Sequence, residues 1–467
     1  MQAKITRHFM KMIYREGSPQ PKNHIQTLMR VGYDFNAAIA DIIDNSISAD
    51  AKKIWIKIHD VDLDLPALSI IDNGIGMNSN ELFENMIIGC KDTTFEREKT
   101  DLGRFGSGMK MASFSQARKL IVISKKKDSE ICAFVWDVDE IINQNKWCLG
   151  ELDPNQIMEL EHLDQSILKN SGTQLIWERL PKWQVGDDEE KARTIENAAE
   201  DLKEYLALYF HKFLDKGYVG PNNKIEIKVH GTVLKPVDPF LRHAKGYQEG
   251  PEEKQRVKGG WIEMQVHVLP HHSELSQDEM DKYSKLYLKQ GLYIYRSKRL
   301  ILADGWLGVA NVPQLGKLAR VEINIPSGCD EEWELDVQKS KVQLPRKIRE
   351  LLRRLIKTPV ESSKREYVYR GEKEEANPYW FINKNKREKT VTYEIQADNK
   401  EFIELAQSIT KKNVPLVRSY LKNLQKHLPI PHIYQQSANS PKSINQNDAT
   451  INIPDEVRKK LGEIWIK

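Results

Sequence analysis

Apolar residues recur at two spacings along the first part of the chain, and the alternation of these spacings predicts a layered α+β fold. From Ile25 to Ser48 they follow the helical period, whereas Lys53–Ile58 alternates as a strand does. Ala67–Ile71 is a second strand and ends in a glycine-rich turn. The same patterns predict helices at Glu81–Ile88, Gly108–Ala117 and Glu189–Lys216, and strands at Lys119–Ser124, Cys132–Val138 and Gly172–Arg179. This order favours a mixed sheet with helices layered on one side.

A second α/β unit is expected after the first, beginning with a strand at Ile225–His230. Its further strands are expected at Trp261–Val268, Leu292–Tyr295 and Ala319–Ile325, followed by a basic helix at Gln343–Ile356. Segments without a clear period are expected to be a flexible loop (Gly89–Gly103), an irregular insertion (Glu140–Asn170), a linker (Pro359–Thr392) and a mobile tail (Gln435–Ala449). The expected organisation is an arm (1–24), a first domain (25–220), a second domain (221–358) and a basic C-terminal region (359–467).

The length of 467 residues and the composition restrict the class of protein. This length predicts two or three domains. No apolar stretch approaches the roughly 20 residues of a membrane helix, and the N-terminus lacks the apolar core of a signal peptide, so we expect a soluble cytoplasmic protein without membrane contact. The four cysteines stand far apart without a CxxC pair, and the adjacent His271 and His272 are expected in a loop, so a zinc site is not expected.

The formal charge of +4 conceals a basic segment. From Lys339 to Lys426 there are 22 Lys and Arg against 11 Asp and Glu, which leaves the rest of the chain acidic. Such a segment favours an acidic partner, of which nucleic acid is the commonest. The alternative is that these charges form solvated helix faces, because Arg346–Arg354 also has the pattern of an amphipathic helix.

The first cluster of candidate site residues is Asp41-Ile42-Ile43-Asp44-Asn45-Ser46. Asp41 and Asn45 are four residues apart and share one face of the predicted helix, while Ile42 and Ile43 face the core. A carboxylate can orient or deprotonate water, and an amide oxygen is a hard ligand for Mg²⁺. The alternative is an ordinary helix end, where Asp and Asn are common caps.

The second cluster directly follows an apolar strand and comprises Asp72, Asn73, Gly74, Ile75, Gly76 and Met77. Two glycines let the backbone turn sharply and approach a flat ligand. A buried Asp72 can accept a hydrogen bond from an exocyclic amine such as that of adenine. A tight turn without a ligand is the alternative, because Asn-Gly is itself a strong turn signal.

The third cluster lies before the helix predicted at Gly108 and comprises Gly103, Arg104, Phe105, Gly106, Ser107, Gly108, Met109 and Lys110. It lacks Walker A spacing, and it follows a loop instead of a strand. Glycines before a helix expose N–H groups that can hold phosphates, although a flexible connector has the same composition. Thr173, which opens a later strand, is a candidate for a water-mediated contact to the base.

Taken together and in this order, the clusters resemble the GHKL (Bergerat-fold) ATPase superfamily. "AAIADIIDNSISADAKKIWI" and "LGRFGSGMKMASFSQARKLIVISKK" are most similar to MORC proteins and their bacterial relatives. The resemblance implies ATP and Mg²⁺ as ligands. Asp41 stands where the family has a general-base Glu, which is a departure, and Asn45 matches the magnesium ligand. The resemblance assigns Asp72, Gly74, Gly76 and Met77 to the adenine side, and Gly103 to Lys110 to the phosphates.

A later segment, "GLYIYRSKRLI", resembles the transducer domain that follows the pocket in MORC, MutL and gyrase. By this resemblance Lys339 in "WELDVQKSKVQLP" is the candidate for contacting the γ-phosphate, with Lys341 as the alternative. The resemblance implies an ATPase that acts as an ATP-gated dimeric clamp, with DNA as the expected partner and a role in genome maintenance or defence. The alternatives are a heat-shock-type chaperone, a MutL-like repair protein, a sensor kinase, a topoisomerase subunit and a nucleotide switch with little turnover.

Overall fold

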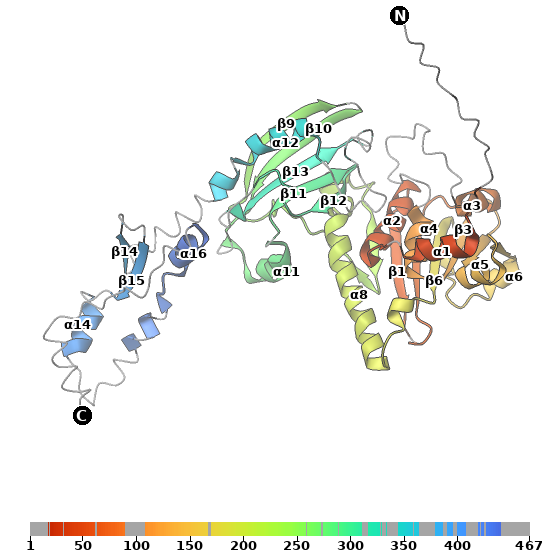
Figure 1. Cartoon of the computed structure of the whole chain (residues 1–467), viewed down its shortest axis with the longest axis horizontal. Helices are drawn as coiled ribbons and strands as arrows, with labels where there is room; N and C mark the ends of the chain where they lie inside the picture. The colour runs from red at the N-terminus through yellow and green to blue at the C-terminus, as the bar shows by residue number, and fades with distance from the viewer. Residues whose placement is uncertain are drawn as a thin grey trace, which may run out of the picture. The chain divides into compact units, whose positions relative to one another are not determined.

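The structure of the chain is a computed structural model, and its described residues form two compact units (Figure 1). The first unit extends to Val237 and the second begins at Asp238. The described residues are 17, 19–30, 32–60, 63–88, 108–166, 170–257, 259–271, 274–287, 289–310, 316–326, 328, 333, 344–357, 359–363, 379–385, 390–395, 399–407, 419–420, 422–424 and 426–439.

The first unit contains an eight-stranded mixed sheet with the order β5-β4-β3-β6-β2-β1-β7-β8. Only β1 and β7 pair in parallel, and the other neighbours are antiparallel. Because β7 and β8 belong to this sheet, the first unit extends past the boundary expected at residue 220. The strands are β1 (Lys53–His59), β2 (Ala67–Asp72), β3 (Lys119–Lys125), β4 (Cys132–Asp137), β5 (Leu149–Leu152), β6 (Gly172–Glu178), β7 (Glu226–Val229) and β8 (Thr232–Val233).

The prediction of one continuous helical segment for Ile25–Ser48 is wrong, because the structure has two helices there, α1 (Pro21–Met29) and α2 (Phe35–Ser48). The Asp34 carboxylate accepts hydrogen bonds from the backbone N–H groups of Asn36 and Ala37, and this cap starts α2. Since α1 begins at Pro21, its first turn occupies the end of the arm expected at residues 1–24. The remaining helices of the unit are α3 (Ser79–Met86), α4 (Gly108–Gln116), α5 (Val138–Gln144), α6 (Pro154–Met158), α8 (Asp188–Tyr209), α9 (His211–Leu214) and α10 (Lys216–Val219).

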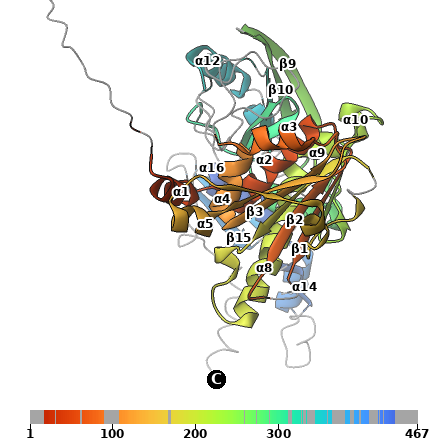
Figure 2. The ribbon, with the colours of Figure 1, turned by 90° about the vertical axis from the view of Figure 1, so that its right-hand side faces the viewer.

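Strand alternation separates two apolar clusters on the two faces of this sheet. Leu120 and Val122 of β3 belong to the large core that includes residues of α2, α4 and α8, and Figure 2 shows α2 and α4 lying across the strands. Ile121 and Ile123 point the other way and pack with Ile157 of α6. The irregular insertion predicted at Glu140–Asn170 is therefore wrong, because that stretch holds part of α5, β5 and α6 and helps to cover the second face.

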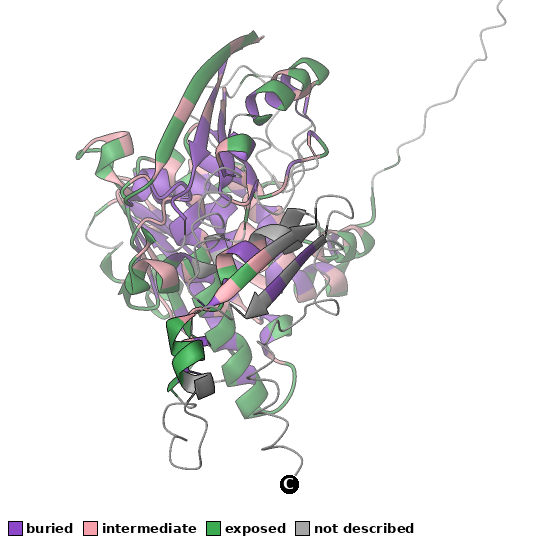
Figure 3. Ribbon diagram, turned by 90° about the vertical axis from the view of Figure 1, so that its left-hand side faces the viewer, coloured by how far each residue is buried: buried purple, intermediate pink, exposed green. Residues whose placement is uncertain are grey.

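The second unit contains a five-stranded sheet with the order β12-β11-β13-β10-β9, in which β11 and β13 are parallel. Ile348, Leu352 and Leu355 of α12 (Arg346–Leu355) pack into its core. Strand β9 forms one edge and is exposed along most of its length (Figure 3). The strands are β9 (Gln248–Val257), β10 (Gly260–Val268), β11 (Gly291–Arg296), β12 (Arg299–Ala303) and β13 (Ala319–Ile325), and a further helix is α11 (Gln277–Tyr287).

Two segments expected to lack regular structure contain it. The hairpin of β14 (Trp380–Asn385) and β15 (Thr390–Ile395) lies largely within the predicted linker. Helix α16 (Ile430–Asn439) extends into the predicted mobile tail, and α14 (Lys400–Gln407) lies between them in sequence. None of the helices in the described part of the chain combines the length and apolar character needed to cross a membrane.

Candidate functional site

Helix α2 places Asp41 and Asn45 on neighbouring turns at the surface of the large core. Ile42 and Ile43 are buried in that core, as expected, whereas Asn45 is exposed and Asp41 is buried with 8% of its surface exposed. The hydroxyl of Tyr33, in the segment before α2, donates a hydrogen bond to Oδ2 of Asp41. Helix α2 therefore does not position Asp41 alone, because the buried Tyr33 also restrains its carboxylate.

The start of helix α4 lies next to Asp41. A Cβ atom built on Gly108 would stand 4.0 Å from Oδ2 of Asp41. The N-terminus of a helix exposes N–H groups and carries partial positive charge, which favours anions. The structure thus brings together the first residue of α4 and the carboxylate of the first cluster, which are far apart in the sequence.

Asp72 ends strand β2 and is the acid of the second cluster, buried with 6% of its surface exposed. Its Oδ2 accepts a 2.9 Å hydrogen bond from the Ser46 hydroxyl, and its Oδ1 accepts one of 2.9 Å from the Gly74 amide. Burial raises the pKa of this carboxyl, while the hydrogen bonds from Gly74 and Ser46 act in the opposite direction. A buried acceptor with fixed orientation is what recognition of an amine requires.

The turn after Asp72 can accommodate only glycine at two of its positions. A Cβ at Gly74 would lie 2.7 Å from the Ala49 carbonyl oxygen. Gly76 has φ +65°, and a Cβ there would lie 1.9 Å from the Lys125 carbonyl oxygen. The glycines therefore let the turn pack closely on its neighbours, and this structural need accounts for them with or without a ligand above the turn.

A hydroxyl network connects the turn to strand β6. The Met77 amide donates to the Ser124 hydroxyl at 2.9 Å, and the Ser124 and Thr173 hydroxyls are 2.9 Å apart. Ser124 is fully buried and Thr173 is 8% exposed. Because Asp72 and Thr173 are directly paired across β2 and β6, the second cluster and Thr173 form one continuous site.

The residues predicted to contact phosphates are described only in part. Met109 packs against the core, and the Lys110 ammonium donates a 2.6 Å hydrogen bond to the Asn85 carbonyl with only 1% of the residue exposed. Lys110 thus contacts the end of α3 in this structure. The remaining residues predicted for this side lie outside the described residues: Gly103, Arg104, Phe105, Gly106, Ser107, Lys339 and its alternative Lys341.

Three residues of the site carried no assigned role in the sequence: Tyr33, Ser46 and Ser124. Ser46 is four residues after Ile42, so the helical period already places it on the buried face of α2. A hydroxyl at such a position needs a partner, which was an available signal. Tyr33 and Ser124 had no comparable signal, because their partners are set by how distant segments pack.

Comparisons with known proteins cover the same part of the chain. Residues 33–173 match the family described as histidine kinase-, DNA gyrase B-, and HSP90-like ATPase. The mouse protein ATPase MORC2B is 35% identical over 101 residues, covering 21% of this chain and 10% of that protein. The Caenorhabditis elegans protein ATPase morc-1 is 30% identical over 90 residues, covering 19% of this chain and 10% of that protein.

A solved structure described as the N-terminal domain of a DNA repair protein has a TM-score of 0.41 and 16% identity, over 74% of this chain and 98% of that one. This likeness is too low to carry an argument. The matched segments span about a tenth of the curated relatives. The family match contains Asp41, Asp72, Gly108 and Thr173, which the fold brings into one site. Residues 33–173 of this chain therefore match the histidine kinase-, DNA gyrase B-, and HSP90-like ATPase family, and the chain is similar over about a fifth of its length to the MORC ATPases of mouse and Caenorhabditis elegans.

Proposed function

We propose that this chain binds ATP with Mg²⁺ and hydrolyses it, with Asp41 as the base that activates the attacking water. The observation that carries the proposal is the position of the Asp41 carboxylate, which is held by Tyr33 beside the first residue of α4. A phosphate bound at this helix N-terminus would bring its terminal phosphorus close to the carboxylate. Proton removal from a positioned water by such a carboxylate is a common form of general-base catalysis.

The base of the nucleotide would lie over the turn formed by Asp72 to Met77. Asp72 would accept a hydrogen bond from the exocyclic amine of adenine, since Ser46 and Gly74 already direct its two oxygens. Thr173 would contact the base through water. Gly74 and Gly76 would contribute by keeping the backbone of the turn close to its neighbours and free of side chains.

Asn45 fits the role of magnesium ligand. Its amide is exposed on α2 one helical turn after Asp41, and an amide oxygen is a neutral hard donor. Mg²⁺ is usually bound through one or two protein side chains together with the substrate phosphates, so one amide can suffice on the protein side. When bound, the ion would neutralise charge on the phosphates.

The aspartate at position 41 is one methylene shorter than the glutamate usual in this superfamily. The Tyr33 hydroxyl bonded to Asp41 would fix the direction of the shorter side chain. We propose that the remaining candidates, Gly103 to Ser107 and Lys339, hold the phosphates when nucleotide is bound, whereas the buried Lys110 ammonium is bonded to the Asn85 carbonyl and holds the end of α3.

We further propose that ATP binding joins two chains into a clamp that acts on DNA. Support comes from the cations exposed on and just after α12, which are Arg346, Lys347, Arg353, Arg354 and Lys357. Glu350 is the one acid in this helix, and it pairs with Arg346 at 3.1 Å. A helix face on which cations outnumber acids in this way is suited to phosphate backbones.

ATP turnover of the wild type and of Asp41→Asn, each with and without duplex DNA at stated salt, tests these proposals. We expect Asp41→Asn to lower turnover by about 10²-fold or more while ATP still binds. DNA should raise turnover of the wild type, and Lys347→Gln combined with Arg354→Gln should reduce that stimulation. Wild-type turnover that does not change when DNA is added would favour the chaperone alternative. A chain that stays monomeric in the presence of a non-hydrolysable ATP analogue would contradict the clamp.

A further inference from the structure

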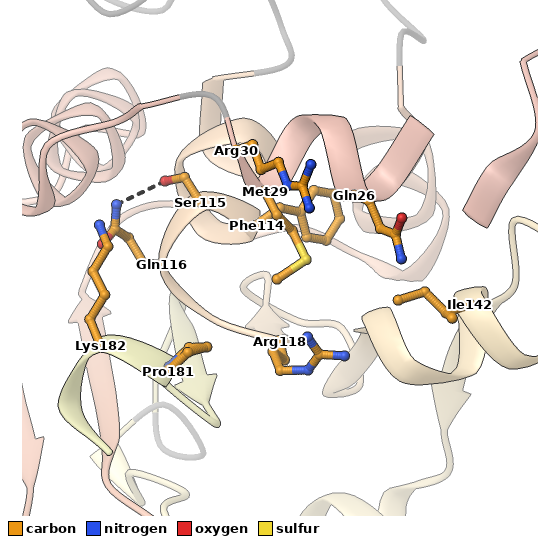
Figure 4. Close-up of a pocket in the computed structure, with 10 residues that line it drawn as sticks. All are labelled: Gln26, Met29, Arg30, Phe114, Ser115, Gln116, Arg118, Ile142, Pro181 and Lys182. Atoms are coloured by element: carbon orange, nitrogen blue, oxygen red, sulfur yellow. Dashed lines mark hydrogen bonds between the residues drawn. The ribbon is translucent and has the colours of Figure 1, made fainter. Parts of the chain in front are cut away.

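A cleft of about 390 Å³ opens between α1, α4, α5 and the short helix η1 (Pro181–Trp183) (Figure 4). None of its lining residues belongs to the nucleotide site described above. Its volume falls at the lower end of the range of small-molecule sites. The cleft is therefore large enough for a small organic ligand but not for a folded domain.

The polar lining of the cleft is cationic. Arg30, Arg118 and Lys182 come from three separate segments, and no carboxylate residue is among the lining. Arg118 pairs with Asp139, and this hydrogen bond raises the pKa of Arg118. Arg30 and Lys182 are exposed and form no ion pair with any residue in the described part of the chain. Two cations thus remain available to an anion.

The rest of the lining includes an apolar surface. Phe114 is buried with 1% of its surface exposed, and Met29 and Ile142 are partly buried against the same core. In Figure 4 the Arg30 side chain lies above this surface and Arg118 below it, with Met29 and Phe114 between them. A ligand that matches both features has an anionic head and an apolar body.

The cleft is linked to Asp41 through two hydrogen bonds that share Tyr33. The Gln116 side-chain amide, which lines the cleft, donates to the Tyr33 carbonyl oxygen at 3.0 Å, and the Tyr33 hydroxyl donates to Asp41. The same Gln116 amide also donates to the Ser115 hydroxyl at 2.9 Å. Helix α4 makes the same connection, because Gly108 at its start lies beside Asp41 and Gln116 at its end lines the cleft.

We propose that this cleft binds a small organic oxyanion with an apolar body, and that its occupancy lowers ATP turnover through Gln116 and Tyr33. An oxyanion that accepts hydrogen bonds from the Gln116 side-chain amide competes with the Tyr33 carbonyl for this donor. The segment with Tyr33, which holds Asp41, is then held less firmly. The binding half of this proposal is independent of the proposed function, whereas the effect on turnover rests on it.

Calorimetric titration of the nucleotide-free full chain tests the binding half, with phenyl phosphate, benzoate, inorganic phosphate and benzyl alcohol as probes. We expect one site for the aromatic anions and weaker binding of the two probes that lack either the ring or the charge. Whichever of phenyl phosphate and benzoate binds more tightly shows whether the site prefers a phosphate or a carboxylate head. Inorganic phosphate that binds as tightly as phenyl phosphate would overturn the apolar half of the site.

Arg30→Gln combined with Lys182→Gln should weaken the binding of the aromatic anions by about tenfold or more, because hydrogen bonds to charged groups are lost. The matched control is Lys216→Gln combined with Lys224→Gln, which removes two exposed lysines of the same unit and should leave binding unchanged. All four side chains are exposed, so both variants should fold. Equal binding by the wild type and the Arg30/Lys182 variant would overturn the site, because the probe would then bind elsewhere, for example in the nucleotide pocket.

The effect on turnover is measured at saturating phenyl phosphate. We expect a decrease of about fivefold or more in the wild type, the lower end of usual coupling, and a smaller decrease in the Arg30/Lys182 variant. Unchanged turnover with the probe bound would overturn the link to Asp41. If probe binding is intact but no chain hydrolyses ATP, the proposed function fails while the site stands, and the affinity for a non-hydrolysable ATP analogue with and without probe then decides the link.

Discussion

The Ser46 hydroxyl donates a 2.9 Å hydrogen bond to Oδ2 of Asp72, and this bond joins helix α2 to strand β2 inside the site. Both residues are buried, with 3% and 6% of their surfaces exposed. Burial raises the pKa of Asp72, whereas this bond and the one from Gly74 favour its charged form. Ser46 therefore favours the charged form of Asp72, which the role proposed for it in binding adenine requires.

Ser46→Ala should lower the free energy of unfolding of the first unit by about 1–3 kcal/mol, because a buried carboxylate oxygen loses its partner. The pKa of Asp72 should rise further, so affinity for an ATP analogue should decline at a higher pH than in the wild type. Urea unfolding and titration with the analogue measure the two effects. Ser48→Ala is the control on the same helix, since the Ser48 hydroxyl donates to the backbone carbonyl of Asp44 within α2. Similar losses in both variants would contradict a special role for Ser46.

Gly76→Ala should destabilise the protein more than Gly220→Ala does. Both glycines have positive φ, +65° and +78°, so each alanine carries backbone strain. A Cβ at Gly76 would also collide with the Lys125 carbonyl oxygen at 1.9 Å, whereas at Gly220 it meets nothing within 4 Å. We expect an additional cost of about 1–3 kcal/mol at Gly76, measured by urea unfolding. Equal costs would show that the turn can open without loss.

The regular elements around the site could be predicted because their patterns are local. The alternation in Lys53–Ile58 and the position of Gly108 before an apolar helix are both visible in the sequence, and β1 and α4 confirm them. The break between α1 and α2 was missed because apolar spacing continues across it. There Asp34 caps a new helix, and that signal is a single residue.

Prediction was weakest where a partner is distant in sequence. Short elements between residues 138 and 158 have no long period, yet Ile157 becomes buried because it meets Ile121 and Ile123 on the sheet. Strand β7 pairs with β1 in parallel, and no local pattern shows which sheet a strand joins. Tyr33 likewise gains its place in the site through a fold contact with Asp41.

The stability of the first unit should fall as the pH decreases from about 6.5 toward 4, through His59. Burial, with nearby His162 and Lys57, lowers the pKa of His59 to about 4. Its ring stacks on His162 at 4.1 Å and its Nε2 lies 2.9 Å from the Ser69 hydroxyl. The folded state holds His59 neutral while the unfolded state binds a proton below pH 6.5, so acid favours unfolding in this window.

His59→Gln should reduce the dependence of unfolding free energy on pH between 6.5 and 4, as measured by urea unfolding across that range. His243→Gln, which replaces an exposed histidine of the second unit, is the control and should leave the slope for the first unit unchanged. An unaltered slope in His59→Gln would assign the acid sensitivity to other groups.

Tyr33→Phe tests whether the hydroxyl on Asp41 serves catalysis or only stability. The change removes one donor and keeps the buried ring, so ATP affinity should stay within about twofold. Turnover should fall by about tenfold to a hundredfold, because a hydrogen bond to a charged group is worth about 1.5–3 kcal/mol. In the Asp41→Asn background the same change should have little further effect on turnover, since the base it positions is already gone. If the two changes multiply instead, Tyr33 acts only on the fold, and the shorter acid at position 41 must be held by other contacts.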